Sequence, residues 1–380
     1  MSSPRKRESI RHIDDEPAIR LEIQMNEIML DELNTYPLYD PAGMGQRIRE
    51  LPEQILDAWK LAGEFPLPDD YASVDKVAVL GMGGSAIGGD LVKRIIANES
   101  KAQVSVFREY NLPAWVDERT LVIASSYSGN TEETLSAFDQ ALKTPAKKLV
   151  ITTGGKLLDI ASQNGVPAFV FSYSAQPRAA IAWGIFPLLN FLVRLGLVPD
   201  KAAEVAEAAM VSEQFARKIE PSKLLSHNLA KDLAYKLNGR IAVIYGADIA
   251  AEVAYRWQTQ LNENSKQWAF AQTLPELNHN AVVGYQFPAD LLHKIQVVML
   301  RSNQIYGRNL KRYQITAELL TRAGARITFA DGRGISPLAQ MMSLILLGDY
   351  VSYYLAILNR TDPTPVDTIT YLKERLADTI

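Results

Sequence analysis

The chain contains no cysteine, few histidines and no long uninterrupted apolar run. Without cysteine it can form no disulfide, thiolate nucleophile, iron–sulfur cluster or cysteine-ligated zinc site. The apolar stretch 341–358 is interrupted by Asp349 and holds two serines and three tyrosines, so we expect a buried helix there and no membrane span. The histidines are too scattered to indicate a metal site: His12, His227, His279 and His293.

The balance of charge gives no reason to expect nucleic acid or an anionic membrane as a partner. Lys and Arg number 40 against 43 for Asp and Glu, a net charge of -3. Residues 1–7 lead into charge rather than into an apolar segment, so we expect no signal peptide. These features fit a cytoplasmic location. With 380 residues, 47% of them hydrophobic, the chain is long enough for two domains.

Two short stretches, 77–85 and 125–133, are the most informative part of the sequence. Each is an apolar strand that runs into a Gly/Ser turn and then into a helical pattern. This arrangement directs backbone N–H groups and the positive end of a helix toward an anion. The second turn adds the hydroxyls of Ser126, Ser128 and Thr131. Three hydroxyls with the turn amides can satisfy the oxygens of a phosphomonoester, so we predict a phosphate site.

The first turn alone also permits a different interpretation. Residues 81–86 fit the G-x-G-x-x-A fingerprint of dinucleotide-binding domains, which would indicate an NAD-dependent oxidoreductase. Glu109 is placed to bind the ribose of such a cofactor, although Arg108 lies beside it. A dinucleotide domain gains nothing from a hydroxyl-rich turn after its next strand. The second turn therefore favours a phosphorylated ligand over NAD.

The residues after 73 alternate between strand and helix patterns, which predicts an α/β fold with a doubly wound, mostly parallel sheet. In the first half we expect strands at 76–80, 103–107, 120–124, 148–152 and 167–171, and helices at 85–98, 131–142, 156–163 and 178–195. In the second half we expect helices at 200–219, 222–238, 249–262 and 307–323, and strands at 241–245, 295–300 and 325–329.

The second half repeats the architecture of the first but not its phosphate turn, because residues 301–306 lack the glycine and the hydroxyls. We therefore predict one phosphate site per chain. The expected division is a tail and helical extension at 1–73, a first domain at 74–198 and a second domain at 199–380 with a C-terminal helix. In the extension, helical patterns cover 18–34 and 43–62, the latter broken at 51–52.

Two polar segments of the second half contain groups suited to acid–base chemistry. Glu263 stands among amides at the end of a predicted helix, and His279 lies in a dense polar segment between apolar runs. On chemistry alone, a solvated acid and a hydrogen-bonded loop histidine are the commoner explanations. Glu276 is a competing carboxylate.

Five motifs in order make the chain resemble the bifunctional phosphoglucose/phosphomannose isomerases, which are sugar isomerase (SIS) domain proteins of the phosphoglucose isomerase superfamily. They are GMGGS at 81–85, SYSGNT at 126–131, NENSK at 262–266, PELNHN at 275–280 and PVDTITYLK at 365–373. The resemblance covers about residues 74–380 and leaves 1–73 unexplained. It implies two SIS-type domains, aldose–ketose isomerisation of sugar phosphates without cofactor or metal, and a homodimer.

The resemblance also implies a role for individual residues. Glu263 would carry a proton between C2 and C1, and Arg178 would stabilise the enediolate. His279, reaching in from the partner subunit, and Lys373 would assist ring opening. The phosphate-binding positions would be Gly83, Gly84, Ser85, Ser126, Ser128 and Thr131. These residues supply the groups that aldose–ketose isomerisation requires: one base positioned over adjacent carbons, a second acid–base group for the ring oxygen, and a fixed cation for the enediolate charge.

The sequence leaves other interpretations of its function open. A non-catalytic SIS protein that senses phosphosugars would keep the phosphate turn but would not need both Glu263 and His279. An isomerase that acts on amino-sugar phosphates would likewise not need both residues, and an isomerase specific for glucose is a further alternative. A zinc-dependent phosphomannose isomerase would need a cluster of His and Glu ligands that this sequence does not suggest.

Overall fold

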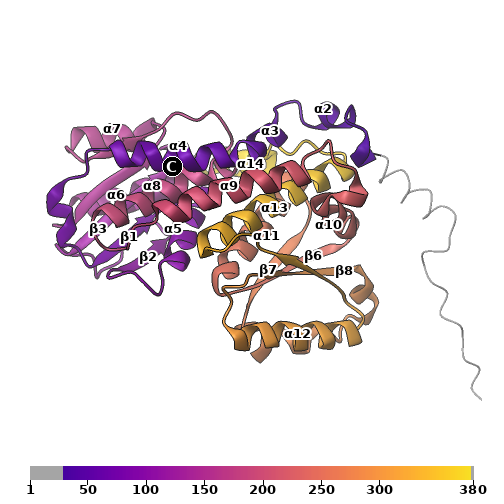
Figure 1. Ribbon diagram of the computed structural model, residues 1–380. Helices are drawn as coiled ribbons and strands as arrows, with labels where there is room; N and C mark the ends of the chain where they lie inside the picture. Colours follow the sequence, from indigo (N-terminus) through magenta and orange to yellow (C-terminus); the bar gives the residue numbers. More distant parts are fainter. Residues whose placement is uncertain (1–28, 378–380) are drawn as a thin grey trace, which may run out of the picture.

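The computed structural model describes residues 29–377 and contains two parallel β-sheets that lie at opposite ends of the molecule (Figure 1). The first sheet has the strand order β2-β1-β3-β4-β5 and consists of β1 (Lys76–Leu80), β2 (Gln103–Phe107), β3 (Thr120–Ser126), β4 (Lys147–Thr152) and β5 (Ala168–Val170). The second has the order β7-β6-β8-β9 and consists of β6 (Ile241–Ala247), β7 (Ala269–Leu274), β8 (Ile295–Arg301) and β9 (Arg326–Asp331).

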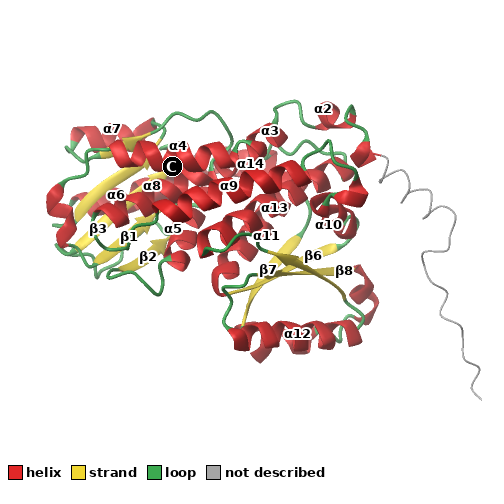
Figure 2. Cartoon of the chain, viewed as in Figure 1, coloured by secondary structure: helices red, strands yellow, loops and turns green. Residues whose placement is uncertain are grey.

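Helices cover both sheets and fill the space between them (Figure 2). The first half of the chain contributes α2 (Thr35–Tyr39), α3 (Met44–Arg49), α4 (Leu51–Glu64), α5 (Gly83–Ile95), α6 (Glu132–Leu142), α7 (Gly155–Gln163) and α8 (Ile181–Arg194). The second half contributes α9 (Ala202–Ile219), α10 (Leu229–Leu237), α11 (Ala251–Ser265), α12 (Gly307–Arg322), α13 (Pro337–Leu358) and α14 (Asp367–Ala377).

Alternating side chains of the first sheet pack against helices on its two faces. Val77 and Val79 belong to the core that includes α5 and α8, whereas Ala78 and Leu80 belong to a separate core with Phe138 of α6. In both sheets the first strand lies between the second and the third, which is the doubly wound order. The predicted fold class and the repeat of architecture in the second half are therefore confirmed.

The structure corrects three local predictions. The edge strand β7 was not among the predicted strands, because only two of its six residues are buried and its apolar run ends at Gln272 and Thr273. The helix predicted at 222–238 begins only at Leu229, since the Asn228 side chain accepts hydrogen bonds from the Ala230 and Lys231 amides and caps α10 there. The helix predicted at 178–195 is a 3-10 turn, Pro177–Ala179, followed by α8.

The N-terminal extension packs along the helices that join the two halves. The predicted break at 51–52 is confirmed, because α3 ends at Arg49 and α4 begins with Pro52 in its first turn. Helix α4 lies against α8 and α9, and Arg49 forms an ion pair with Glu213 of α9 at 2.7 Å. Most of the helix predicted at 18–34 lies outside the described residues.

Helix α13 is the central element of the second half and is buried along its whole length. By length and composition it is the one helix in the described residues apolar enough to cross a membrane, but it packs inside the protein against α9, α10 and α11. The predicted buried helix is thus confirmed. Its one charged residue, Asp349, accepts from the Arg256 guanidinium at 2.7 Å and from Gln260 at 3.0 Å.

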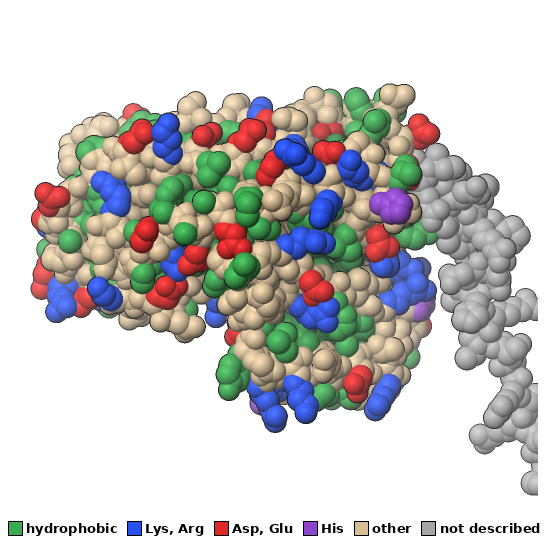
Figure 3. Space-filling view, in the orientation of Figure 1, with side chains coloured by type: hydrophobic (Ala, Val, Ile, Leu, Met, Phe, Trp, Pro, Cys, Tyr) green, Lys and Arg blue, Asp and Glu red, His purple; other side chains and the backbone are tan. Residues whose placement is uncertain are grey.

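On the face shown in Figure 3, basic and acidic side chains are interspersed rather than gathered into a patch of one sign. This distribution agrees with the small net charge of the chain.

We predict that Asp349→Ala lowers the free energy of unfolding by about 3–5 kcal/mol, because it leaves the buried Arg256 guanidinium without its counter-ion. Urea denaturation would measure the change. The matched control is Asp139→Ala, which removes the acid of the exposed pair with Lys143 and should cost less than about 1 kcal/mol. Equal losses from the two variants would contradict the structural importance of the buried pair.

Candidate functional site

The hydroxyl-rich turn after β3 is held in a fixed shape by its own hydrogen bonds. The buried Ser126 hydroxyl lies 2.9 Å from the Thr131 hydroxyl and accepts from the Gly129 amide at 3.1 Å. Gly129 has a φ of +66°, and a Cβ there would lie 1.8 Å from the Gly154 carbonyl oxygen. Only glycine can occupy position 129 without this clash. The turn therefore presents Ser126 and Thr131 together at the start of α6.

The two predicted turns meet, because β1 and β3 are adjacent parallel strands. The Tyr127 amide donates to the Ser85 hydroxyl at 3.2 Å, which joins the first turn to the second. Ser128 and Gly83 are exposed, whereas Ser85 and Gly84 are half-buried. The structure thus places the two turns that the sequence assigned to phosphate side by side, and we call them together the cradle.

Arg178 follows β5 and lies beside the first turn. A Cβ on Gly84 would lie 3.2 Å from the Pro177 carbonyl oxygen, so glycine at this position allows the turn to approach the arginine segment closely. The Arg178 side chain is buried, and its Nε donates to Asn264 Oδ1 at 2.6 Å. One terminal nitrogen donates to the carbonyl oxygens of Pro363 and Thr364, at 2.6 and 2.7 Å.

The other terminal nitrogen of Arg178 faces Glu263, whose carboxylate oxygen lies 3.5 Å away. Burial lowers the pKa of the Arg178 guanidinium, and the Glu263 carboxylate opposes that shift. Glu263 lies in the last turn of α11, and its side chain is partly exposed. The structure therefore brings a carboxylate and a fixed cation together from positions 85 residues apart.

Lys266 is a further cation at this point that the sequence did not single out as a site residue. Its ammonium donates to the Glu263 carbonyl at 2.9 Å and to the Asp362 carbonyl at 2.7 Å. Burial, and next the positive charge of Arg178, lower the pKa of Lys266. With Arg178, it attaches the chain segment before α14 to the end of α11.

His279 is not brought to Glu263 within one chain. Helix α11 ends where β7 begins, and His279 is exposed in a short turn after β7 ends. Strand β7 has six residues, so the two ends are separated by about 17 Å at roughly 3.3 Å per residue. Within residues 29–377, no hydrogen bond or ion pair connects His279 with Glu263 or Arg178.

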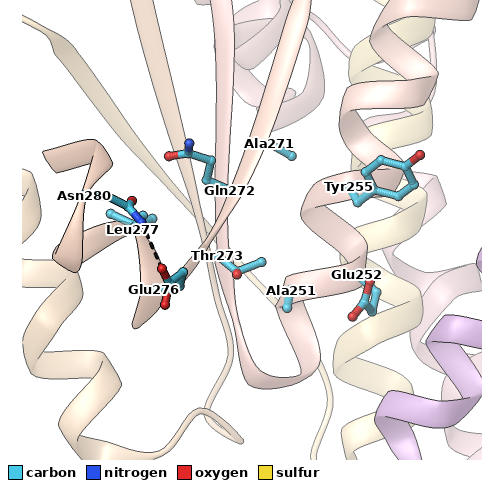
Figure 4. A pocket seen from close by; sticks show the side chains of 9 residues that line it. All are labelled: Ala251, Glu252, Tyr255, Ala271, Gln272, Thr273, Glu276, Leu277 and Asn280. Carbon is cyan, nitrogen blue, oxygen red and sulfur yellow. Dashed lines mark hydrogen bonds between the residues drawn. The ribbon is translucent and has the colours of Figure 1, made fainter. Parts of the chain in front are cut away.

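The competing carboxylate, Glu276, lies at the same end of β7 as His279. It accepts from the Asn280 side chain at 2.9 Å and lines a cavity of about 370 Å³ with Glu252 and Tyr255 of α11 (Figure 4). Glu252 forms an ion pair with Arg94 of α5. Glu263, and not Glu276, is thus the carboxylate beside Arg178.

Lys373 lies on α14, which begins three residues after Thr364 and is exposed to solvent on all sides of the described helix. Its apolar residues Ile369, Leu372 and Leu376 are exposed as well. No hydrogen bond or ion pair in the described part of the chain connects Lys373 with the cradle or with Glu263. In the same residues, no three acidic or histidine side chains lie close enough together to hold a metal ion.

The chain is similar in sequence to a family of known proteins. Residues 226–376 match the family model described as bacterial phospho-glucose isomerase C-terminal SIS domain. The chain is 42% identical over 336 residues to a bifunctional phosphoglucose/phosphomannose isomerase of Caldicellulosiruptor bescii, covering 88% of this chain and 99% of that one. It is 35% identical to the enzyme of the same name from Aquifex aeolicus, covering 81% and 92%.

The fold is also that of solved phosphosugar isomerases. The tagatose-6-phosphate ketose/aldose isomerase of Escherichia coli superimposes with a TM-score of 0.67 at 14% identity, covering 86% of this chain and 96% of that one. At such low identity the likeness supports the two-sheet SIS fold alone. The identity to the C. bescii enzyme, extending over nearly its whole length, shows more: the chain belongs to the family of bifunctional phosphoglucose/phosphomannose isomerases.

Proposed function

We propose that the protein interconverts glucose 6-phosphate and mannose 6-phosphate with fructose 6-phosphate through an enediolate. The observation that carries this proposal is the pairing of the Glu263 carboxylate with the fixed Arg178 guanidinium, beside a turn of hydroxyls and amides suited to phosphate. The names of the related enzymes support the same reaction. A sensor of phosphosugars would not need a carboxylate held against a buried arginine.

In the proposed reaction, the cradle binds the phosphate, far from the reacting carbons, and so orients the sugar. Glu263 removes the proton from C2 and returns it to C1, and Arg178 stabilises the negative charge that develops on the enediolate oxygens. The substrates differ only in configuration at C2, and C2 is planar in the enediolate. One base can therefore serve both, provided that the C1–C2 end rotates about the C2–C3 bond.

The proposed site draws on both domains, since the cradle belongs to 74–198 and Glu263 to 199–380. We further propose that ring opening uses His279 of a second copy, which makes the active form a homodimer. The placement of His279 at the far end of β7 supports this, because its own chain holds it well away from Glu263. Lys373 is proposed to assist from α14, which starts close to Arg178.

Glu263→Gln should lower turnover of both sugar phosphates together, by about 10²- to 10⁴-fold, because an amide cannot accept the C2 proton. Exchange of that proton with solvent, followed by NMR in D₂O, should be lost in parallel. In the wild type each sugar phosphate should inhibit the other with an inhibition constant close to its own KM.

The control for this prediction is Glu276→Gln, which changes the competing carboxylate at the other end of β7 and should leave proton exchange intact. Exchange that survives in Glu263→Gln but disappears in Glu276→Gln would assign the base to Glu276. If mannose 6-phosphate neither reacts nor competes, the enzyme is specific for glucose.

Replacing Ser126 and Thr131 together by Ala should raise KM at least tenfold, because each hydroxyl donated to a charged phosphate contributes about 1.5–3 kcal/mol. Steady-state kinetics with glucose 6-phosphate would measure this. Ser136→Ala with Thr144→Ala removes two hydroxyls outside the cradle that donate to backbone carbonyls, and should leave KM unchanged. An unchanged KM in the cradle variant would place the phosphate elsewhere.

The shared site predicts complementation between two inactive variants. Glu263→Gln and His279→Ala should each be nearly inactive alone. When they are unfolded and refolded together, half of the dimers are mixed, and each mixed dimer holds one intact pair of Glu263 and His279. Activity should return to about a quarter of the wild-type value. No recovery, with mixed dimers present by native mass spectrometry, would mean that His279 does not act across an interface.

A further inference from the structure

Both the side chain and the backbone of Arg178 are held by a closed ring of buried hydrogen bonds. Asn264 accepts from Arg178 Nε at 2.6 Å and donates to the Ser352 hydroxyl at 2.9 Å. Ser352 donates to the backbone carbonyl of Asp349 at 2.8 Å. The Asp349 carboxylate binds Arg256, which donates back to the Arg178 carbonyl at 3.0 Å.

The ring connects the two halves of the molecule through buried side chains. Asn264 and Ser352 are fully buried, and Arg178 is 6% exposed. Arg178 belongs to the segment after β5, whereas Asn264 lies on α11 and Ser352 on α13. A guanidinium has five donors, and three of those on Arg178 are taken by Asn264 and by the carbonyls of Pro363 and Thr364. The two donors that remain are on the nitrogen that faces Glu263.

We propose that Asn264 is a positioning residue for the reaction: it fixes the plane of the Arg178 guanidinium so that its one remaining nitrogen points at the developing enediolate. The proposal rests on the role of Arg178 in the proposed function. Asn264 directly follows Glu263 on α11, so the same end of one helix sets both the base and the cation. Their relative position is then fixed before the substrate arrives, as electrostatic stabilisation requires.

The chemistry of asparagine suits this position. Its carbonyl oxygen accepts from Arg178 Nε while its amide nitrogen donates to Ser352, so one side chain satisfies both neighbours. Leucine has a similar volume but offers neither group. An Arg178 side chain that loses its acceptor at Nε retains its two carbonyl partners but can pivot about them. The charge would remain in the site while its direction becomes variable.

The test measures turnover and two inhibitor affinities in Asn264→Leu. We expect kcat to fall about 10- to 100-fold, as for small displacements of a catalytic group. Affinity for 5-phospho-D-arabinonate, whose carboxylate carries the charge of the enediolate, should fall by about the same factor. Affinity for sorbitol 6-phosphate, which is neutral at C1 and C2 and is bound through the same phosphate, should stay within about threefold of the wild-type value.

Two further variants keep the test decisive. Ser352→Ala removes the next member of the ring with little change of volume, and it should also lower kcat and the affinity for 5-phospho-D-arabinonate. This variant provides the test if Asn264→Leu does not fold. The matched control is Asn190→Leu, a buried asparagine of α8 that donates to the Trp59 carbonyl at 3.2 Å. It should lower stability without changing kcat per folded molecule or either affinity.

Arg178→Met separates this proposal from the proposed function. If Arg178→Met leaves kcat unchanged, the assigned role of Arg178 is wrong. If Arg178→Met lowers kcat while Asn264→Leu and Ser352→Ala change neither kcat nor arabinonate affinity, only the positioning role of Asn264 is overturned. Equal losses of both inhibitor affinities in Asn264→Leu would likewise overturn it, because they would indicate a general loss of the site.

Discussion

The structure depends on burying one guanidinium, that of Arg178, at the junction of its two halves. A charge removed from water is costly unless its donors are satisfied. Its own half presents Arg178 on a short turn after β5, and the acceptors come from α11 and from the segment before α14. The two sheets are therefore held in one relative position at the point where Glu263 meets Arg178. The requirement to satisfy a buried cation thus also sets the geometry of the candidate site.

Much of the fold could be predicted because its strands and helices carry strong local patterns. Strands β1, β3 and β8 each contain an uninterrupted apolar run, at 77–80, 121–124 and 297–300, and α13 is apolar on every side. Strand β7 could not be predicted from hydrophobicity, because an edge strand with polar residues is stabilised by pairing with one adjacent strand, here β6, and not by burial. The start of α10 was misplaced because a single cap, Asn228, overrides the helical pattern before it.

The parts of the site differ in the same way. The proximity of the Ser126 and Thr131 hydroxyls could be predicted, because both residues belong to one short turn that leads into a helix. The proximity of Arg178 and Glu263 depends on how the two halves of the chain pack, and only the family resemblance indicated it. The hydrogen bond between Asn264 and Arg178 has no local signal in the sequence, because the dipeptide Glu-Asn does not distinguish a solvated asparagine from a buried one. Roles for His279 and Lys373 stay predictions, since neither is placed at the site by its own chain.

The two halves also show how one architecture diverges at its ligand-binding edge. In the first half, the loops after the first and third strands are joined through Ser85, a neutral acceptor for the Tyr127 amide. In the second half the corresponding loops are joined through Asp248, which accepts from the Tyr306 amide at 2.9 Å and from Asn309 at 3.2 Å. The carboxylate already supplies negative charge beside the start of α12, where a phosphate would otherwise be attracted. A second anion there would meet repulsion, which agrees with the prediction of one phosphate site per chain.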